Sequence, residues 1–111
     1  MKNLLKETIE ELELYGKTGA DVLWVGRDYI VYGRYHDSTR VTYKSTWEDF
    51  CSKADFEYDD GYGSPEIPTD LIIVGKDFWL ERGEYDGSEW WEFKTMPEEP
   101  TETRELMFNR H

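Results

Sequence analysis

The sequence has little of what catalytic chemistry usually requires. A single cysteine excludes an internal disulfide, and the two histidines, His36 and His111, are far apart in the chain. The GxSxG, P-loop, GxGxxG, CxxC and HExxH motifs are all missing from the sequence. Carboxylates are plentiful, but no pair is marked out as a glycosidase pair. We therefore expect a protein that is not an enzyme and that uses no cofactor.

Long apolar runs are also missing. No run of about 18 apolar residues is present, so we expect no membrane-spanning helix. The first residues, MKNLLKETIEEL, are acidic and amphipathic, whereas a signal peptide is basic and then apolar. We therefore expect a cytoplasmic protein, and its 111 residues predict one domain with a single modest core. Cys51 lies on the apolar side of a predicted helix, which favours a buried thiol over a nucleophile.

Basic residues are few and unevenly placed. The chain has 13 Lys and Arg against 25 Asp and Glu, a net charge of −12. Residues 1–45 carry seven acids and seven bases, whereas residues 46–111 carry eighteen acids and six bases. Direct nucleic-acid binding needs a basic surface that this chain lacks. The asymmetry instead predicts a basic protein partner. The alternative is that the excess charge serves only solubility.

The strongest pattern present is that of a three-stranded meander at residues 70–93, DLIIVGKDFWLERGEYDGSEWWEF. It predicts strands at 71–74, 78–84 and 89–94, with a tight turn at 75–77 and a two-residue hairpin loop at Asp86-Gly87. A two-residue loop fixes the register of the hairpin. The predicted cross-strand partners are Glu84 with Glu89, Gly83 with Trp90, Arg82 with Trp91, Glu81 with Glu92, and Leu80 with Phe93.

A similar pattern occurs 49 residues upstream, where residues 21–31 align with residues 70–80. Such a repeat predicts two copies of one unit, although chance likeness between two hairpins is the alternative. We predict an α+β fold with an antiparallel sheet or open barrel of about six strands, made from two repeated three-stranded meanders. The expected segments are a helix at 1–16, the first meander at 20–44, a helix at 46–55, the second meander at 70–95 and a tail at 96–111.

Apolar spacing predicts which residues the helices bury. Leu5, Ile9 and Leu12 form one stripe of the first helix. Thr46 begins a capping box for the second helix, whose apolar stripe is core and not a cofactor site. A short helix is expected at 101–110. The principal core residues are predicted to include Trp47, Phe50, Leu71, Ile73, Leu80, Trp91 and Phe93.

The loop at residues 55–70 is acidic, long and interrupted by glycine and proline, as functional loops often are. Asp55, Glu57, Asp59 and Glu66 match positions one, three, five and twelve of a calcium-binding EF-hand loop. The match fails at the sixth position, where Asp60 replaces the required glycine. The loop is therefore a weak candidate for a cation site, and no metal is expected.

The second meander has an acidic and aromatic surface that suits a cationic partner. Two pairs of glutamates are predicted to face each other across the hairpin. Opposed like charges destabilise a sheet, so their presence favours a role for these acids in binding a partner. Tryptophan beside carboxylate favours an arginine-rich surface. The alternative is that Arg82 and Lys94 neutralise the acids and the first helix covers the tryptophans. The predicted partner-binding residues are Trp79, Glu81, Glu84, Glu89, Trp90 and Glu92, with Asp59, Asp60 and Glu66 of the loop.

The runs DFEYDDGYGSPEIPTDLIIVG and WLERGEYDGSEWWEF resemble small acidic uncharacterised proteins of Firmicutes bacteriophages and mobile elements. The resemblance implies a phage-encoded protein in the host cytoplasm. It also implies a possible inhibitor of the anti-CRISPR type, which mimics the charge of nucleic acid. We therefore expect an acidic interaction protein that binds a basic nucleic-acid-binding host protein. The alternatives are a small-ligand or cation-binding domain using residues 55–70, or an accessory phage assembly protein.

Overall fold

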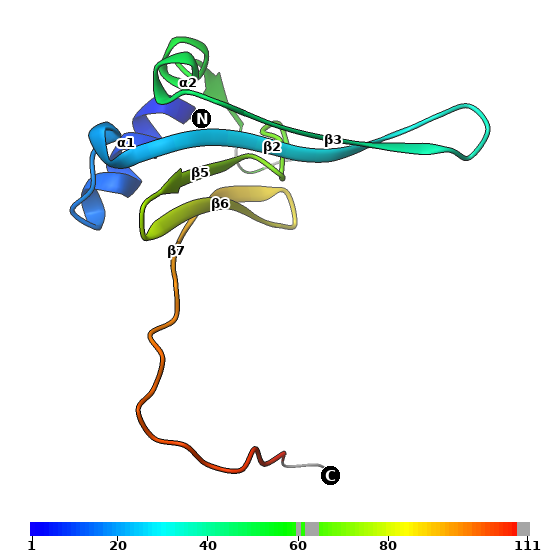
Figure 1. Ribbon diagram of the computed structural model, residues 1–111. Coiled ribbons are helices and arrows are strands. Elements are labelled where there is room, and N and C mark those ends of the chain that lie inside the picture. Colours follow the sequence, from blue (N-terminus) through cyan, green and yellow to red (C-terminus); the bar gives the residue numbers. More distant parts are fainter. Residues whose placement is uncertain (60, 62–64, 109–111) are drawn as a thin grey trace.

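The computed structural model describes residues 1–59, 61 and 65–108 (Figure 1). Five antiparallel strands form one sheet in the order β3-β2-β5-β6-β7, and β1 pairs with β4 in a small second sheet. The large sheet is not closed, which confirms the predicted α+β class with an open antiparallel sheet. The elements are β1 (Lys2–Asn3), α1 (Leu4–Leu14), a 3-10 turn (Gly19–Asp21), β2 (Val22–Tyr32), β3 (Ser38–Ser45), α2 (Trp47–Lys53), β4 (Glu57–Tyr58), β5 (Ile72–Gly75), β6 (Phe78–Tyr85) and β7 (Ser88–Thr95).

The second meander forms as predicted. Strands β6 and β7 are joined by Asp86-Gly87, and both loop residues have positive φ, 50° and 86°. These values belong to a type I′ turn, whose twist matches that of the flanking strands. All five predicted cross-strand pairs are present.

The first unit is not a second copy of this meander, so the prediction of two equivalent three-stranded units is wrong. Strand β2 runs without a break through residues 26–28, where the aligned residues 75–77 make a turn. Asp70 holds this part of β2 extended: its carboxylate accepts two hydrogen bonds from Arg27, at 2.9 and 3.0 Å, and one from the Asp28 amide at 2.8 Å. Beyond Gly26, β3 is the one described strand that pairs with β2, and the part of this hairpin beyond Asp28 projects from the body as an arm (Figure 1).

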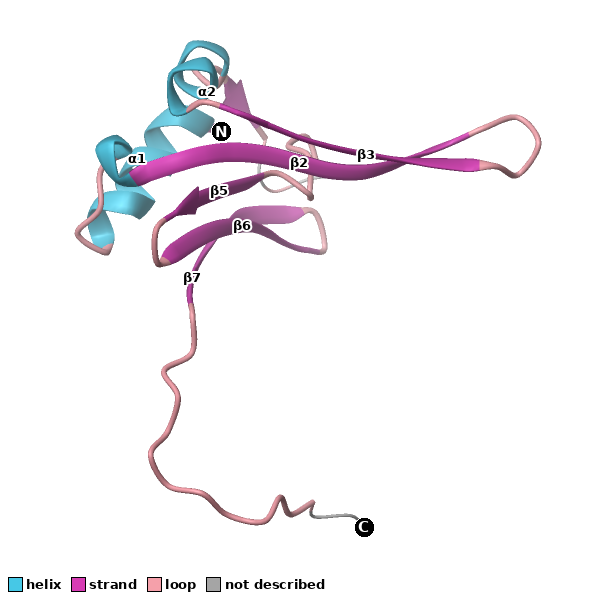
Figure 2. Ribbon diagram, in the orientation of Figure 1, coloured by secondary structure: helices cyan, strands magenta, loops and turns pink. Residues whose placement is uncertain are grey.

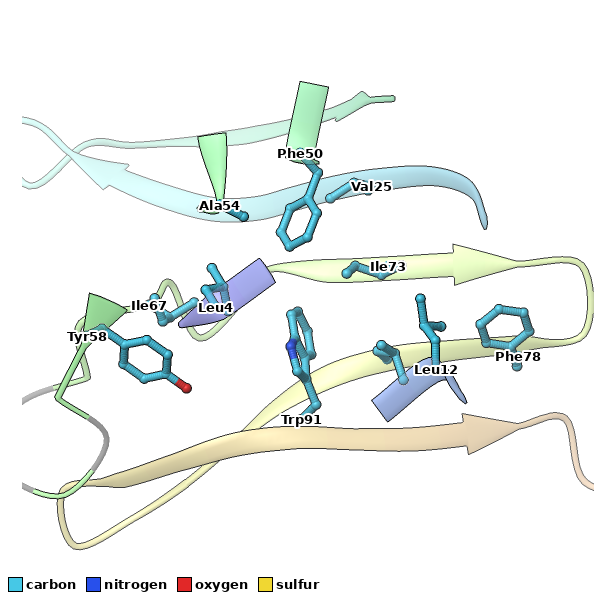
Figure 3. Close-up of a cluster of buried hydrophobic side chains, with 11 residues drawn as sticks. Leu4, Leu12, Val25, Phe50, Ala54, Tyr58, Ile67, Ile73, Phe78 and Trp91 are labelled. Atoms are coloured by element: carbon cyan, nitrogen blue, oxygen red, sulfur yellow. The ribbon is translucent and has the colours of Figure 1, made fainter. Parts of the chain in front are cut away.

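Both helices cover the same face of the sheet (Figure 2). Their buried side chains meet those of β2, β5, β6 and β7 in one cluster (Figure 3). Of the predicted core residues, Phe50, Ile73, Leu80 and Trp91 are buried, while Trp47, Leu71 and Phe93 are partly buried against them. The core comprises Leu4, Leu12, Val25, Phe50, Ala54, Tyr58, Ile67, Ile73, Phe78, Leu80 and Trp91.

The helix termini follow local capping chemistry. The Asn3 side chain accepts a hydrogen bond from the Lys6 amide at the start of α1, and Thr46 caps α2 through the Asp49 amide, as predicted. The buried stripe of α1 is Leu4, Thr8 and Leu12. Leu12 is buried as predicted, whereas Leu4 and Thr8 take the places predicted for Leu5 and Ile9.

The tail leaves the body after β7 (Figure 1). Residues 101–108 are not helical, so the expected terminal helix does not form in the described residues, and the rest of that prediction, 109–110, lies outside them. No helix in the described part of the chain has the length and apolar character needed to cross a bilayer.

Candidate interaction surface

The face of the sheet opposite the helices carries three tryptophans. We call this surface the open face, because no described helix or strand lies on it (Figure 2). The strand register places its side chains in three rows across the sheet. The rows are Trp24, Val74, Trp79 and Lys94; then Lys44, Gly26, Ile72, Glu81 and Glu92; then Gly83 and Trp90.

Two of the tryptophans lie flat over glycines. A Cβ atom on Gly83 would collide with the Trp90 indole, and a Cβ atom on Gly26 would collide with the Trp24 ring. Any larger residue at either glycine would displace the indole above it. The bare backbone of Gly26 and Gly83 therefore permits these two rings to lie against the sheet.

Glu81 and Glu92 stand directly opposite each other in the middle of the open face. They share one cation: Lys94 Nζ lies 3.6 Å from the Glu81 carboxylate and 3.8 Å from that of Glu92. All three side chains are about half exposed. Two carboxylates with one lysine leave a net negative charge between Trp79 and Trp90.

Glu84 and Glu89 do not belong to this surface. Side chains alternate along a strand, so Glu84 and Glu89 lie on the helix-covered side with Arg82 and Trp91. Glu89 is only 3% exposed and cannot contact a partner. The prediction that Glu89 binds a partner is therefore corrected. Glu84 is exposed at the end of the hairpin, away from the open face.

Glu89 serves the fold instead. Its carboxylate accepts hydrogen bonds from the backbone amides of Glu66 and Ile67, at 2.9 and 3.1 Å. It also lies 3.3 Å from an Arg82 Nη2 donor. A buried carboxylate with this many donors has its hydrogen-bonding capacity satisfied. Glu89 thereby ties the 66–67 segment to the start of β7.

Arg82 is the centre of a buried polar cluster. Its guanidinium donates to Glu7 and to the Tyr58 hydroxyl, each at 3.0 Å, and its Cζ lies 4.6 Å from the centre of the Trp91 ring. Burial, together with the hydrogen bond to Glu7, raises the pKa of Tyr58 well above its ordinary value. The phenol therefore stays protonated and donates to Glu7. These contacts join α1, β4 and β6.

The described residues of the acidic loop do not assemble the weak candidate cation site. Asp55 accepts a hydrogen bond from Asn3, and the Glu66 carboxylate accepts one from the Asp59 amide. Glu57 lies in β4 and is exposed. Asp60 lies outside the described residues. Among the residues described, no three His, Cys, Asp or Glu side chains come close enough together to hold a metal ion.

Sequence reasoning missed Trp24, Ile72 and Val74 as members of the open face. The available signal was the pairing of the strand at 22–25 with that at 71–74, which could not be read without knowing the strand order. It also missed the buried cluster, although alternation from Leu80 through Arg82 predicts that Arg82 points inward.

No family model, curated protein or solved structure matches the chain. The chemistry of the open face is therefore the basis for assigning a function.

Proposed function

We propose that this chain is an acidic interaction protein that binds a basic, nucleic-acid-binding surface of another protein through its open face. The observation that supports this most is the centre of that face, where two opposed carboxylates share Lys94 between Trp79 and Trp90. Carboxylates directly opposite each other do not favour sheet pairing. An added cation from a partner would remove that repulsion.

The aromatic residues specify what kind of cation suits the surface. An arginine guanidinium binds carboxylate through two parallel hydrogen bonds and stacks on an indole ring. Trp90 is 36% exposed, so its ring is available for such a contact. Trp79 and Trp24 are half-buried and supply apolar area around the charged centre. Tryptophan and arginine are also the residues that most often dominate protein–protein binding energy.

The negative field extends past the open face. The tail at residues 96–111 adds Glu98, Glu99, Glu102 and Glu105 against two arginines, Arg104 and Arg110. A field of one sign raises the rate at which a basic partner is encountered. A protein that occupies a basic groove in this way excludes nucleic acid from it. The resemblance to phage proteins supports an inhibitory role of that kind.

A defined probe tests the proposal. Binding of a labelled peptide of about ten arginines, a stand-in for a basic surface, is measured by fluorescence anisotropy at low and high salt. We expect E81Q/E92Q and W90A each to weaken binding, and added salt to weaken binding of the wild type. The matched control is E10Q/E13Q on α1, which removes the same charge from exposed positions elsewhere. Equal losses for the control and for E81Q/E92Q would show that only net charge matters.

The same variants then identify a natural partner. Host lysate is passed over the immobilised wild type and over E81Q/E92Q, and the captured proteins are compared by mass spectrometry. A specific partner is retained by the wild type and lost from the variant. Capture of the same proteins by both chains would show that the open face is not the binding surface.

A further inference from the structure

Strand β3 forms a long outer edge of the sheet. It runs for eight residues, Ser38–Ser45, and among the described strands it pairs with β2 alone. The outward backbone N–H and C=O groups of such an edge are a template for another extended segment. β3 contains Arg40 and Lys44 and no acidic residue. The edge therefore suits an extended, acidic strand.

The tail supplies a segment of matching length and opposite charge. Residues 101–108, TETRELMF, are eight residues without proline, after a spacer that contains Pro97 and Pro100. Residues 96–108 carry four acids and one base. Arg104 Nε donates to Glu102 at 2.8 Å, which places residues two apart on one side of the tail, as in a strand. Three large apolar residues are exposed at its end: Leu106, Met107 and Phe108.

The tail is too short to reach β3 of its own chain. Thr95 ends β7 at the opposite edge of the five-stranded sheet. A strand added outside β3 lies five strand intervals from β7, about 24 Å at about 4.8 Å each. The chain from Thr95 to Thr101 spans at most about 21 Å even when fully extended. Pairing of the whole segment therefore requires a second molecule.

We propose that residues 101–108 of one molecule add as a strand to the outer edge of β3 in a second copy of this chain. Main-chain hydrogen bonds provide the binding, and the opposite charges of the tail and β3 provide the selectivity. Two such exchanges close a two-fold dimer, with each tail on the partner's β3. This association uses the backbone edge of β3 and not the centre of the open face at Glu81 and Glu92, so it does not rest on the function proposed above.

The first test is a proline scan of the tail. Association is measured by sedimentation velocity at up to about 100 µM for the wild type, T103P, R104P and E99P. We expect the wild type to dimerise. Successive N–H groups along a strand point to opposite sides, so one of T103P and R104P removes a donor to β3 and should raise the dimer dissociation constant at least about tenfold. E99P lies in the spacer and should dimerise nearly as well as the wild type. A monomeric wild type would overturn the proposal, and so would T103P and R104P variants that both dimerise as well as E99P.

A charge reversal tests the partner surface. K44E on β3 and E102K/E105K on the tail are each expected to weaken the dimer, while a mixture of the two variants should associate again. In the mixed dimer, the native tail of K44E lies on the native β3 of E102K/E105K. The lysine-bearing tail of E102K/E105K lies on the β3 of K44E, so both charges of that contact are reversed. These positions are exposed, and thermal melts confirm that each variant is folded. Failure of the mixture to associate would overturn tail exchange. The proposed function is tested separately by E81Q/E92Q, whose loss of arginine-peptide binding does not depend on dimerisation.

Discussion

Glu84 and Glu89 face each other across the end of the β6–β7 hairpin, yet only one of them is exposed. Glu89 is covered by Arg82 and by the segment at residues 66–67, and it accepts a hydrogen bond from each of the two backbone amides of that segment. Glu84 extends past this cover into solvent. The two carboxylates therefore form no repelling pair in water, because one of them is fully occupied by donors.

This asymmetry gives a matched pair of variants. E89Q removes the charge that two amides and Arg82 bind, so we expect it to lower the free energy of unfolding by about 1–3 kcal/mol. E84Q should change it by less than about 0.5 kcal/mol, as is usual at an exposed site. Chemical denaturation measures both. Equal effects would show that Glu89 has no special structural role.

Removing the arginine of the buried cluster should cost more. R82M leaves the buried Glu89 without a cation and leaves Glu7 with Lys2 alone. Breaking a buried ion pair in this way costs about 3–5 kcal/mol. The double variant R82M/E89M removes both charges and is expected to be more stable than R82M alone. A double variant less stable than R82M would show that the Glu89 contacts to residues 66–67 dominate.

Adjacent tryptophans on opposite faces of β7 should respond differently to truncation. Trp91 is 5% exposed, and its Nε1 donates to the Thr8 hydroxyl at 2.8 Å, so W91A should cost about 3–5 kcal/mol. W90A removes a ring at the surface and should cost less than half as much. Thermal or denaturant unfolding distinguishes the two. A loss under about 1 kcal/mol for W91A would contradict the assignment of faces.

Asp70 predicts a dependence of stability on pH. Burial raises its pKa, but the hydrogen bonds from Arg27 and the Asp28 amide outweigh burial and hold the pKa below its ordinary value. The stabilisation is therefore complete above about pH 4, the unfolded value, and is lost as the pH falls toward the folded pKa. We expect D70N to destabilise by about 1–3 kcal/mol at pH 7 and by less at pH 3. A difference that is constant with pH would exclude this carboxylate as the cause.

Neutralising the open face should leave the fold intact. E81Q/E92Q removes the repulsion between two opposed carboxylates, which should raise the free energy of unfolding by a few tenths of a kcal/mol. It also removes two exposed ion pairs with Lys94, which should lower it by about as much. We expect a change of less than about 0.5 kcal/mol in denaturant unfolding. Marked destabilisation would show that Lys94 and the two glutamates act mainly to hold β6 to β7.

The sequence allowed the second meander to be predicted in detail because Asp86-Gly87 both selects the turn and fixes the register. It misled about the first unit, since Val25-Gly26-Arg27-Asp28 and Val74-Gly75-Lys76-Asp77 are nearly alike locally. Asp70, 43 residues from Arg27, decides between strand and turn, and local pattern does not show such a contact. The open face was found in part, because alternation identified Trp79, Glu81, Trp90 and Glu92 but the strand order that adds Trp24 was unknown.

The glycines under Trp24 and Trp90 affect the entropy of binding. A tryptophan on an open strand normally samples several rotamers, and fixing one on binding costs about 0.5–1.5 kcal/mol for a flexible side chain. Gly26 and Gly83 let each indole rest against the backbone before any partner arrives. Less rotational freedom then remains to be lost. A sheet face of this kind is preorganised, and its affinity depends on two residues that have no side chain.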